Sequence, residues 1–246
     1  MPLCQINTHL LFYELTGQGP TVALMHHATG SSRSWRRQIP ALLARFQVLT
    51  IDRPGFGRSP DLAPWPVDYL RRDRDDLLAL LDGLGIEQAA LVGHSDGATI
   101  ALLAAASQPQ RITQVVAEAP HVTVETPRCP DAVRAAMHRI AETPDLVAAL
   151  ERDHGERALP VAQRWADRWL DPAFWSWDER PALAGVRCPV LVVHGAKDPF
   201  FSAAQAELVA GGVARGTLWM LPGVGHSPHT EAAEHYTERI LDFLAS

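Results

Sequence analysis

The order in which short apolar runs alternate with helical patterns restricts this chain to one class of fold. Runs such as 21–26 and 189–194 are largely apolar, as in strands of a parallel sheet that are buried on both faces. Segments with apolar residues at helical spacing, such as 68–84, separate them. Strands that alternate with helices build a mainly parallel sheet covered on both faces. The expected strands are 3–6, 10–15, 21–26, 48–51, 89–92, 112–117, 189–194 and 217–221, and the expected helices are 32–46, 68–84, 98–106, 203–210 and 231–244.

The alternation stops between residues 121 and 180, where helical segments and proline breaks occur without a convincing strand. We therefore predict a core formed by residues 1–120 and 181–246, with a helical cap inserted at 121–180. The first two strands should be joined by a turn at Asn7-Thr8. With 246 residues, 47% of them hydrophobic, the chain can bury a core that needs no disulfide or metal to stabilise it.

Charge and cysteine content exclude several classes of partner. The balance of 22 basic to 28 acidic residues argues against a nucleic-acid scaffold, which would show a basic domain or stripe, and the densest charge run, 71–76, mixes both signs. No apolar run reaches the roughly 18–20 residues that span a bilayer, and the N-terminus does not resemble a signal peptide. Cys4, Cys129 and Cys188 have no metal or redox spacing. We expect reduced thiols, a cytoplasmic location, and neither a nucleic-acid nor a membrane partner; the sequence does not indicate an oligomeric state.

A nucleophile motif lies between the strand at 89–92 and the helix at 98–106. Gly93-His94-Ser95-Asp96-Gly97 matches G-x-S-x-G in the strand–turn–helix context that gives the motif its meaning. A sharp turn there lifts the serine hydroxyl out of the sheet, and Gly93 and Gly97 leave room for neighbouring backbone. The helix N-terminus favours negative charge that develops at Ser95.

Together with four further motifs, this elbow resembles the α/β-hydrolase fold superfamily over nearly the whole chain. These motifs are Leu24-Met25-His26-His27, Asp52-Arg53-Pro54-Gly55-Phe56-Gly57-Arg58-Ser59, His194-Gly195-Ala196-Lys197-Asp198-Pro199 and Pro222-Gly223-Val224-Gly225-His226-Ser227. The resemblance implies an α/β fold with an eight-stranded, mainly parallel sheet flanked by helices, an inserted helical cap, and catalysis without a cofactor or metal.

The resemblance also implies a catalytic triad in the order Ser, Asp or Glu, His. Ser95 would be the nucleophile, His226 the general base, and Asp198 the acid that orients the imidazole. Two competitors remain open: Glu118, which follows the sixth strand, for the acid, and His229 for the base.

The oxyanion hole should combine the backbone N–H groups of Ala28 and Asp96. The family usually has His-Gly where this chain has His26-His27, so His27 either contacts substrate or is an accommodated loop residue. The Asp96 side chain either stabilises the helix N-terminus or binds a cationic or hydroxylated substrate group. We interpret His94 as a packing residue.

The insert holds four of the seven tryptophans, at 165, 169, 175 and 177. Trp165 and Trp169 share a helix face, and they either anchor the cap or contact substrate. His121 follows the sixth strand and either lines the pocket or has a structural role. A cap with this apolar content suggests a small or medium, partly apolar acyl or aromatic substrate.

These residues favour a cofactor-independent serine hydrolase that cleaves an ester, thioester or lactone through an acyl-enzyme. The alternatives are a carbon–carbon bond hydrolase of the meta-cleavage-product type, which uses the same triad, and a non-catalytic ligand-binding member of the family. Haloperoxidase activity would be a side reaction of the same site. Haloalkane dehalogenases carry aspartate at the position of Ser95, which disfavours that activity.

Overall fold

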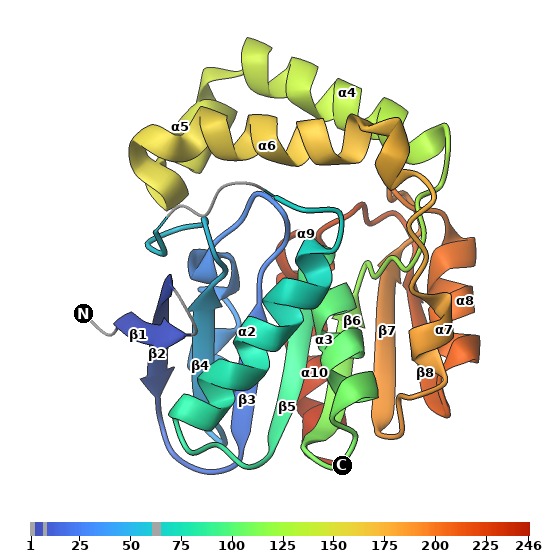
Figure 1. The fold of residues 1–246 in the computed structure, drawn as a ribbon. Coiled ribbons are helices and arrows are strands. Elements are labelled where there is room, and N and C mark those ends of the chain that lie inside the picture. Colours follow the sequence, from blue (N-terminus) through green and yellow to red (C-terminus); the bar gives the residue numbers. More distant parts are fainter. Residues whose placement is uncertain (1–2, 7–8, 61–64) are drawn as a thin grey trace.

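An eight-stranded sheet forms the centre of the molecule in the computed structural model, which describes residues 3–6, 9–60 and 65–246 (Figure 1). The strand order is β1-β2-β4-β3-β5-β6-β7-β8. β2 pairs antiparallel with β1 and with β4, and the other five strand pairs are parallel. The sheet is therefore mainly parallel, as predicted. The turn expected at Asn7-Thr8 lies outside the described residues. The strands are β1 Leu3–Ile6, β2 His9–Thr16, β3 Thr21–Met25, β4 Gln47–Asp52, β5 Ala89–His94, β6 Ile112–Glu118, β7 Pro189–Gly195 and β8 Arg215–Leu221.

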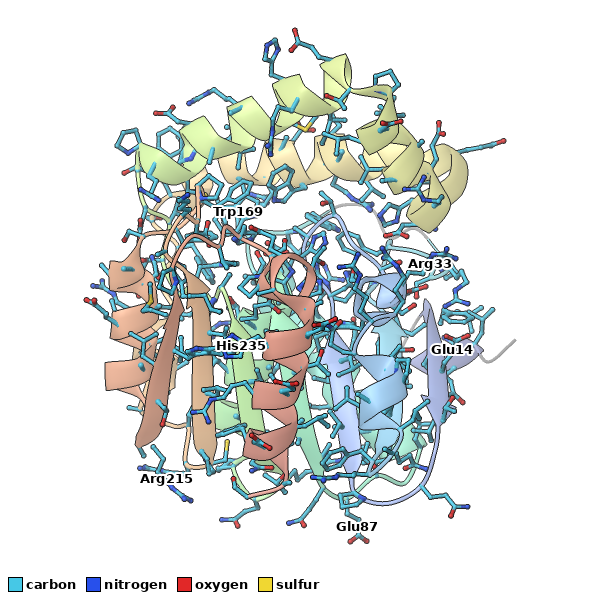
Figure 2. All side chains as sticks on the ribbon, turned by 180° about the vertical axis from the view of Figure 1, so that it is seen from behind. Glu14, Arg33, Glu87, Trp169, Arg215 and His235 are labelled. Carbon is cyan, nitrogen blue, oxygen red and sulfur yellow. The ribbon has the colours of Figure 1, made fainter. Side chains whose placement is uncertain are left out.

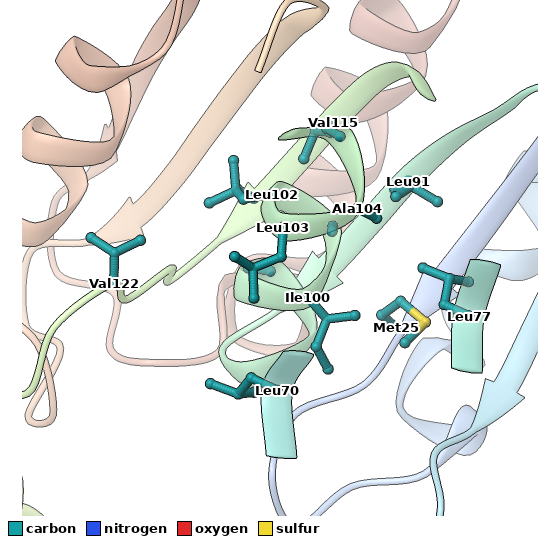
Figure 3. Packing of buried hydrophobic residues seen from close by; sticks show 14 of the residues in the cluster. Met25, Leu70, Leu77, Leu91, Ile100, Leu102, Leu103, Ala104, Val115 and Val122 are labelled. Carbon is teal, nitrogen blue, oxygen red and sulfur yellow. The ribbon is translucent and has the colours of Figure 1, made fainter. Parts of the chain in front are cut away.

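Helices cover both faces of this sheet because alternate residues of each central strand point to opposite sides. On β3, Ala23 and Met25 face a core layer shared with α2, α3 and α8, whereas Val22 and Leu24 face α1 and α10. Figure 3 shows part of the first layer around α3, where several side chains belong to one buried cluster: Leu91, Ile100, Leu102, Leu103 and Val115. The helices are α1 Ile39–Leu42, α2 Tyr69–Gly83, α3 Asp96–Ser107, α7 Arg180–Leu183, α8 Ala203–Gly212, α9 Pro228–Glu231 and α10 Ala233–Leu244.

One predicted helix is wrong in its extent. The segment expected as a single helix at 32–46 forms a 3-10 turn at Ser32–Trp35 followed by the short helix α1. Pro40 lies in the first turn of α1, and proline has no backbone N–H for a bond to a preceding turn, so a continuous helix cannot run through it.

Residues 121–180 contain three longer helices, α4 (Arg128–Glu142), α5 (Pro144–His154) and α6 (Ala158–Leu170). They lie together above the ends of the strands (Figure 1), and we call them the α4–α6 layer. Within the described part of this segment, the sheet-like pairing is a single bridge between Thr123 and Asp178. No helix among the described residues is both long and apolar enough to cross a membrane.

A close approach between β3 and α3 provides a test of the fold. A Cβ atom added at Gly97 would lie 2.2 Å from the backbone oxygen of Met25. We expect Gly97→Ala to lower the free energy of unfolding by about 1–3 kcal/mol, because backbone must move to relieve the overlap. Urea denaturation measures this.

The matched control is Gly211→Ala on α8, where an added Cβ meets nothing within 4 Å. Alanine in an open helical position should stabilise the protein by up to about 1 kcal/mol. Equal stability of Gly97→Ala and the wild type would contradict the close packing of α3 on β3.

Candidate active site

Ser95 occupies the sharp turn between β5 and α3. Its backbone has φ 55° and ψ −118°, and a positive φ is costly for a residue with a Cβ. The Ser95 N–H donates to the Glu118 carbonyl at 2.8 Å, which ties the turn to the end of β6. Gly93 is required beside it, because a Cβ there would lie 2.1 Å from the Gly97 oxygen. The strained turn is thus held by its neighbours, as the G-x-S-x-G context predicts.

His226 and Asp198 lie in contact although they follow different strands. The His226 Nδ1 atom is 2.7 Å from Asp198 Oδ2. The other carboxylate oxygen of Asp198 accepts the backbone N–H groups of Phe200 at 2.8 Å and Phe201 at 3.2 Å. Both oxygens are therefore engaged, and the carboxylate is fixed in one orientation toward the imidazole.

Asp198 is ionised at neutral pH. Burial raises the pKa of this carboxyl, but the adjacent His226 and the hydrogen bonds to the carboxylate outweigh burial and hold the pKa below its ordinary value. The Asp198 carboxylate can therefore accept a hydrogen bond from His226 Nδ1–H. In the imidazole tautomer with its proton on Nδ1, Nε2 carries no proton and can accept one.

The competing acid and base predicted from the sequence form a second pair. Glu118 Oε1 accepts both the backbone N–H of His229 at 2.9 Å and its Nδ1–H at 2.8 Å. The side chains of both residues are buried. The structure thus pairs Glu118 with His229 and Asp198 with His226.

His94, Glu118 and His229 also form a group with the donor types of a metal site, with ligand atoms within 4.8 Å of one another. Hydrogen bonds already engage several of these atoms: Glu118 accepts from His229, and His94 Nε2 is 2.8 Å from the His226 carbonyl. Burial is the main cause that lowers the pKa of His94 to about 3, so its ring is neutral. His94 therefore packs against the loop that carries His226, as interpreted from the sequence.

A cavity of about 610 Å³ is lined by residues of α4, α5 and α6 and by residues that follow β3, β5, β7 and β8. Ser95, His226 and both predicted oxyanion residues, Ala28 and Asp96, line it. The apolar lining comes largely from the α4–α6 layer and includes Val133, Ile140, Leu146, Leu150, Trp165 and Phe200, although Arg139 and Asp153 of this layer also line the cavity. The polar lining on the core side includes His27, Thr29, Ser34, Arg36 and Thr230.

Comparison with known proteins identifies the family. A family model described as the alpha/beta hydrolase fold matches residues 20–173. Serine hydrolase BPHL of Mus musculus is 31% identical over 255 residues, which cover 97% of this chain and 84% of that protein. The chain belongs to the α/β-hydrolase fold family. It is a hydrolase of this fold, which agrees with the architecture predicted from the sequence.

Solved structures share the architecture of this α/β hydrolase. The enol-lactonase from Burkholderia xenovorans LB400 superposes with a TM-score of 0.81 at 23% identity, over 100% of both chains. The meta-cleavage product hydrolase CumD from Pseudomonas fluorescens IP01 superposes with a TM-score of 0.80 at 18% identity, over 100% of this chain and 97% of that one. At these identities the likeness concerns the fold.

Three of the four predicted substrate-binding residues of this α/β hydrolase line the cavity: His27, Trp165 and Trp169. Figure 2 shows Trp169 at the boundary between the α4–α6 layer and the sheet. Burial, with the nearby His94 and His26, lowers the pKa of His27 well below its ordinary value, so this imidazole is neutral at pH 7.

His121 is not among the residues that line the cavity. Its fully buried ring stacks on Phe201 at a centroid distance of 4.5 Å and lies edge-on to Trp169 at 4.9 Å. Its Nε2 is 3.4 Å from Asp96 Oδ1. Of the two roles left open for His121, its position supports the structural one and not pocket lining, because two aromatic side chains cover it.

Asp96 has a side chain that turns into the protein. Burial raises the pKa of this carboxyl, but contacts with His121, Arg53 and Tyr69 outweigh burial and keep it ionised. The Tyr69 hydroxyl donates to Asp96 Oδ2 at 3.0 Å. The carboxylate lies in the first turn of α3, as the helix-stabilising role requires, and protein groups engage it as well.

Sequence reasoning missed the parts played by Phe200 and by Arg53. Phe200 lines the cavity and lies 4.8 Å from the His226 ring, between centroids. Its place two residues after Asp198 was the available signal. Arg53 belongs to the motif that begins at Asp52, but nothing in the sequence indicates which carboxylates its side chain contacts.

Proposed function

We propose that this α/β hydrolase is a cofactor-independent serine hydrolase that cleaves a small or medium carboxylic ester, thioester or lactone through an acyl-enzyme. One observation carries the proposal. Ser95, on a strained turn between a strand and a helix, lines the same cavity as the His226 imidazole, whose Nδ1 is 2.7 Å from Asp198 Oδ2.

In this mechanism Ser95 Oγ attacks the carbonyl carbon of the substrate while His226 Nε2 takes the proton of the Ser95 hydroxyl. The bond to the leaving group then breaks, and the leaving group departs with the proton from His226. Water repeats the same two steps on the acyl-enzyme and releases the acid. Asp198 keeps the His226 proton on Nδ1 and stabilises the imidazolium that forms.

Negative charge on the carbonyl oxygen would be stabilised by the backbone N–H groups of Ala28 and Asp96, which form the oxyanion hole. Both residues line the cavity beside Ser95. The Asp96 N–H also lies at the N-terminus of α3, where the helix dipole favours negative charge.

The α4–α6 layer acts as the cap, inserted at 121–180 into a core of 1–120 and 181–246. A cavity of about 610 Å³ suits a small or medium substrate. Its lining supports an apolar acyl or aryl group beneath the cap and a more polar group near His27 and Arg36. The three cysteines are free thiols, and two of them are buried. This supports a cytoplasmic location, where thiols stay reduced.

The relatives support the proposed serine-hydrolase function more strongly than any one substrate class. The mouse relative is called a serine hydrolase and aligns over nearly the whole chain. The lactonase and the meta-cleavage product hydrolase share the fold, so they support lactone hydrolysis and carbon–carbon hydrolysis as reactions to test.

A fluorophosphonate probe tests whether Ser95 is an activated nucleophile. We expect the wild type to be labelled at one site and Ser95→Ala to lose the label while remaining folded. A folded wild type that takes no label would overturn the proposed chemistry and favour the ligand-binding role.

A substrate panel then separates the reaction classes. It consists of 4-nitrophenyl esters of graded acyl length, a thioester, a lactone and a vinylogous 1,5-diketone. We expect turnover of the oxygen or sulfur esters to exceed that of the diketone. The reverse order would show a carbon–carbon bond hydrolase.

A further inference from the structure

Arg53 is a buried cation that contacts both segments of the predicted oxyanion hole. It directly follows β4, and its side chain is fully buried. Its Nη1 donates to Asp73 Oδ2 at 2.8 Å, and its Nη2 lies 3.2 Å from the His27 carbonyl oxygen and 3.3 Å from Asp96 Oδ2. A buried charge is costly unless it is paired, so these contacts set the place of the guanidinium.

The bond to the His27 carbonyl bears directly on the Ala28 N–H. The two groups belong to one peptide unit, which is trans, and in a planar trans peptide C=O and N–H point in opposite directions. A carbonyl that is held toward Arg53 therefore turns the Ala28 N–H away from it. Ala28 and Ser95 both line the cavity, so the bond to Arg53 fixes the orientation of a peptide N–H beside the proposed nucleophile.

Arg53 reaches the same carbonyl a second time through His26. Its backbone N–H donates to His26 Nε2 at 3.0 Å, which leaves the proton of the neutral ring on Nδ1. That Nδ1 is 2.7 Å from the His27 oxygen. Burial and the adjacent Arg53 lower the pKa of His26 to about 3, which agrees with a neutral ring.

The other segment is held through Asp96. This residue supplies the second predicted N–H donor, at the start of α3, and its carboxylate accepts from Arg53 and from the Tyr69 hydroxyl. One guanidinium thus joins the loop after β3 to the N-terminus of α3, although these segments are far apart in the chain.

We propose that Arg53 is a positioning residue that sets the two backbone donors of the oxyanion hole relative to each other. This inference rests on the proposed serine-hydrolase function. Lysine at this position would keep the charge, but a single ammonium cannot reproduce the planar fork that meets three acceptors.

The test compares 4-nitrophenyl butyrate with the matching thionoester, in which sulfur replaces the carbonyl oxygen. Sulfur is a weak hydrogen-bond acceptor, so the ester-to-thionoester ratio of kcat/KM reports on the hole itself. We expect Arg53→Lys to lower kcat for the ester by about 100-fold with KM nearly unchanged, as a misplacement of about 1 Å does. The ratio should fall by a similar factor, which a merely structural role would not produce.

Arg58→Lys is the matched control. Arg58 lies on the same loop, pairs with Asp52 and Glu14 at 3.3 Å each, and does not line the cavity. The Arg58→Lys variant should keep the wild-type ester-to-thionoester ratio of kcat/KM. If Arg53→Lys does not fold, the same measurements apply to Arg53→Gln combined with Asp73→Asn, which removes the cation together with one of its carboxylate partners.

The outcomes separate the two proposals. A wild type that is neither labelled by fluorophosphonate nor able to hydrolyse the ester overturns the proposed function and, with it, the oxyanion hole. A labelled, active wild type whose ester-to-thionoester ratio is unchanged in the folded Arg53 variant overturns the role of Arg53 alone.

Discussion

Replacement of His226 by alanine is expected to lower kcat for 4-nitrophenyl butyrate by about 10⁶-fold, as in a triad hydrolase that loses its base. The reason is that Ser95 would have no group to take its proton, while the strained turn and the cavity would remain. Steady-state kinetics measures the loss, with circular dichroism to verify the fold.

His229→Gln is the matched control for this experiment. His229 also lines the cavity, but its Nδ1–H is donated to Glu118, and its ring lies against His94 at a centroid distance of 4.9 Å. We expect kcat within about tenfold of the wild type. If His229→Gln lost activity and His226→Ala kept it, the base would be His229 and the acid Glu118.

Asp198→Asn is expected to lower kcat by about 10⁴-fold without loss of the fold. Asp198 Oδ1 accepts two backbone N–H groups, from Phe200 and Phe201, so the oxygen of an asparagine amide should take that place. Its NH₂ group then faces His226 Nδ1, which must accept instead of donate. The ring proton moves to Nε2, and Nε2 can no longer accept the proton of Ser95.

The corresponding change in the second pair should have a small effect. In Glu118→Gln the amide oxygen can still accept both bonds that His229 donates to Glu118 Oε1. We therefore expect kcat within about tenfold of the wild type, measured with the same ester. A larger loss for Glu118→Gln than for Asp198→Asn would exchange the roles assigned to the two carboxylates.

Most of the sheet could be predicted because its signals are local. All eight strands fall at predicted positions. The reason is clearest for β3 and β5, which are buried along their whole length, because a strand that is buried on both faces needs a continuous apolar run. The helix expected at 32–46 failed at Pro40, where the apolar spacing continues but the backbone N–H is missing.

The candidate site was predictable only in part. Ser95 belongs to a pentapeptide in which Gly93 must clear the Gly97 oxygen of the same turn, so this pattern can be found without the fold. The sequence could not decide between the two roles of His121, because the two rings that cover it, Trp169 and Phe201, come from distant parts of the chain.

The α/β class, the strand positions and the strained turn at Ser95 can be inferred from local patterns of residues, because each depends on residues a few positions apart. The pairing of Asp198 with His226 and of Glu118 with His229, and the place of Arg53 between His27 and Asp96, emerge with the folded chain. These contacts join loops at the ends of different strands. Sequence spacing does not determine the distances between such loops, whereas the order of the strands in the sheet does.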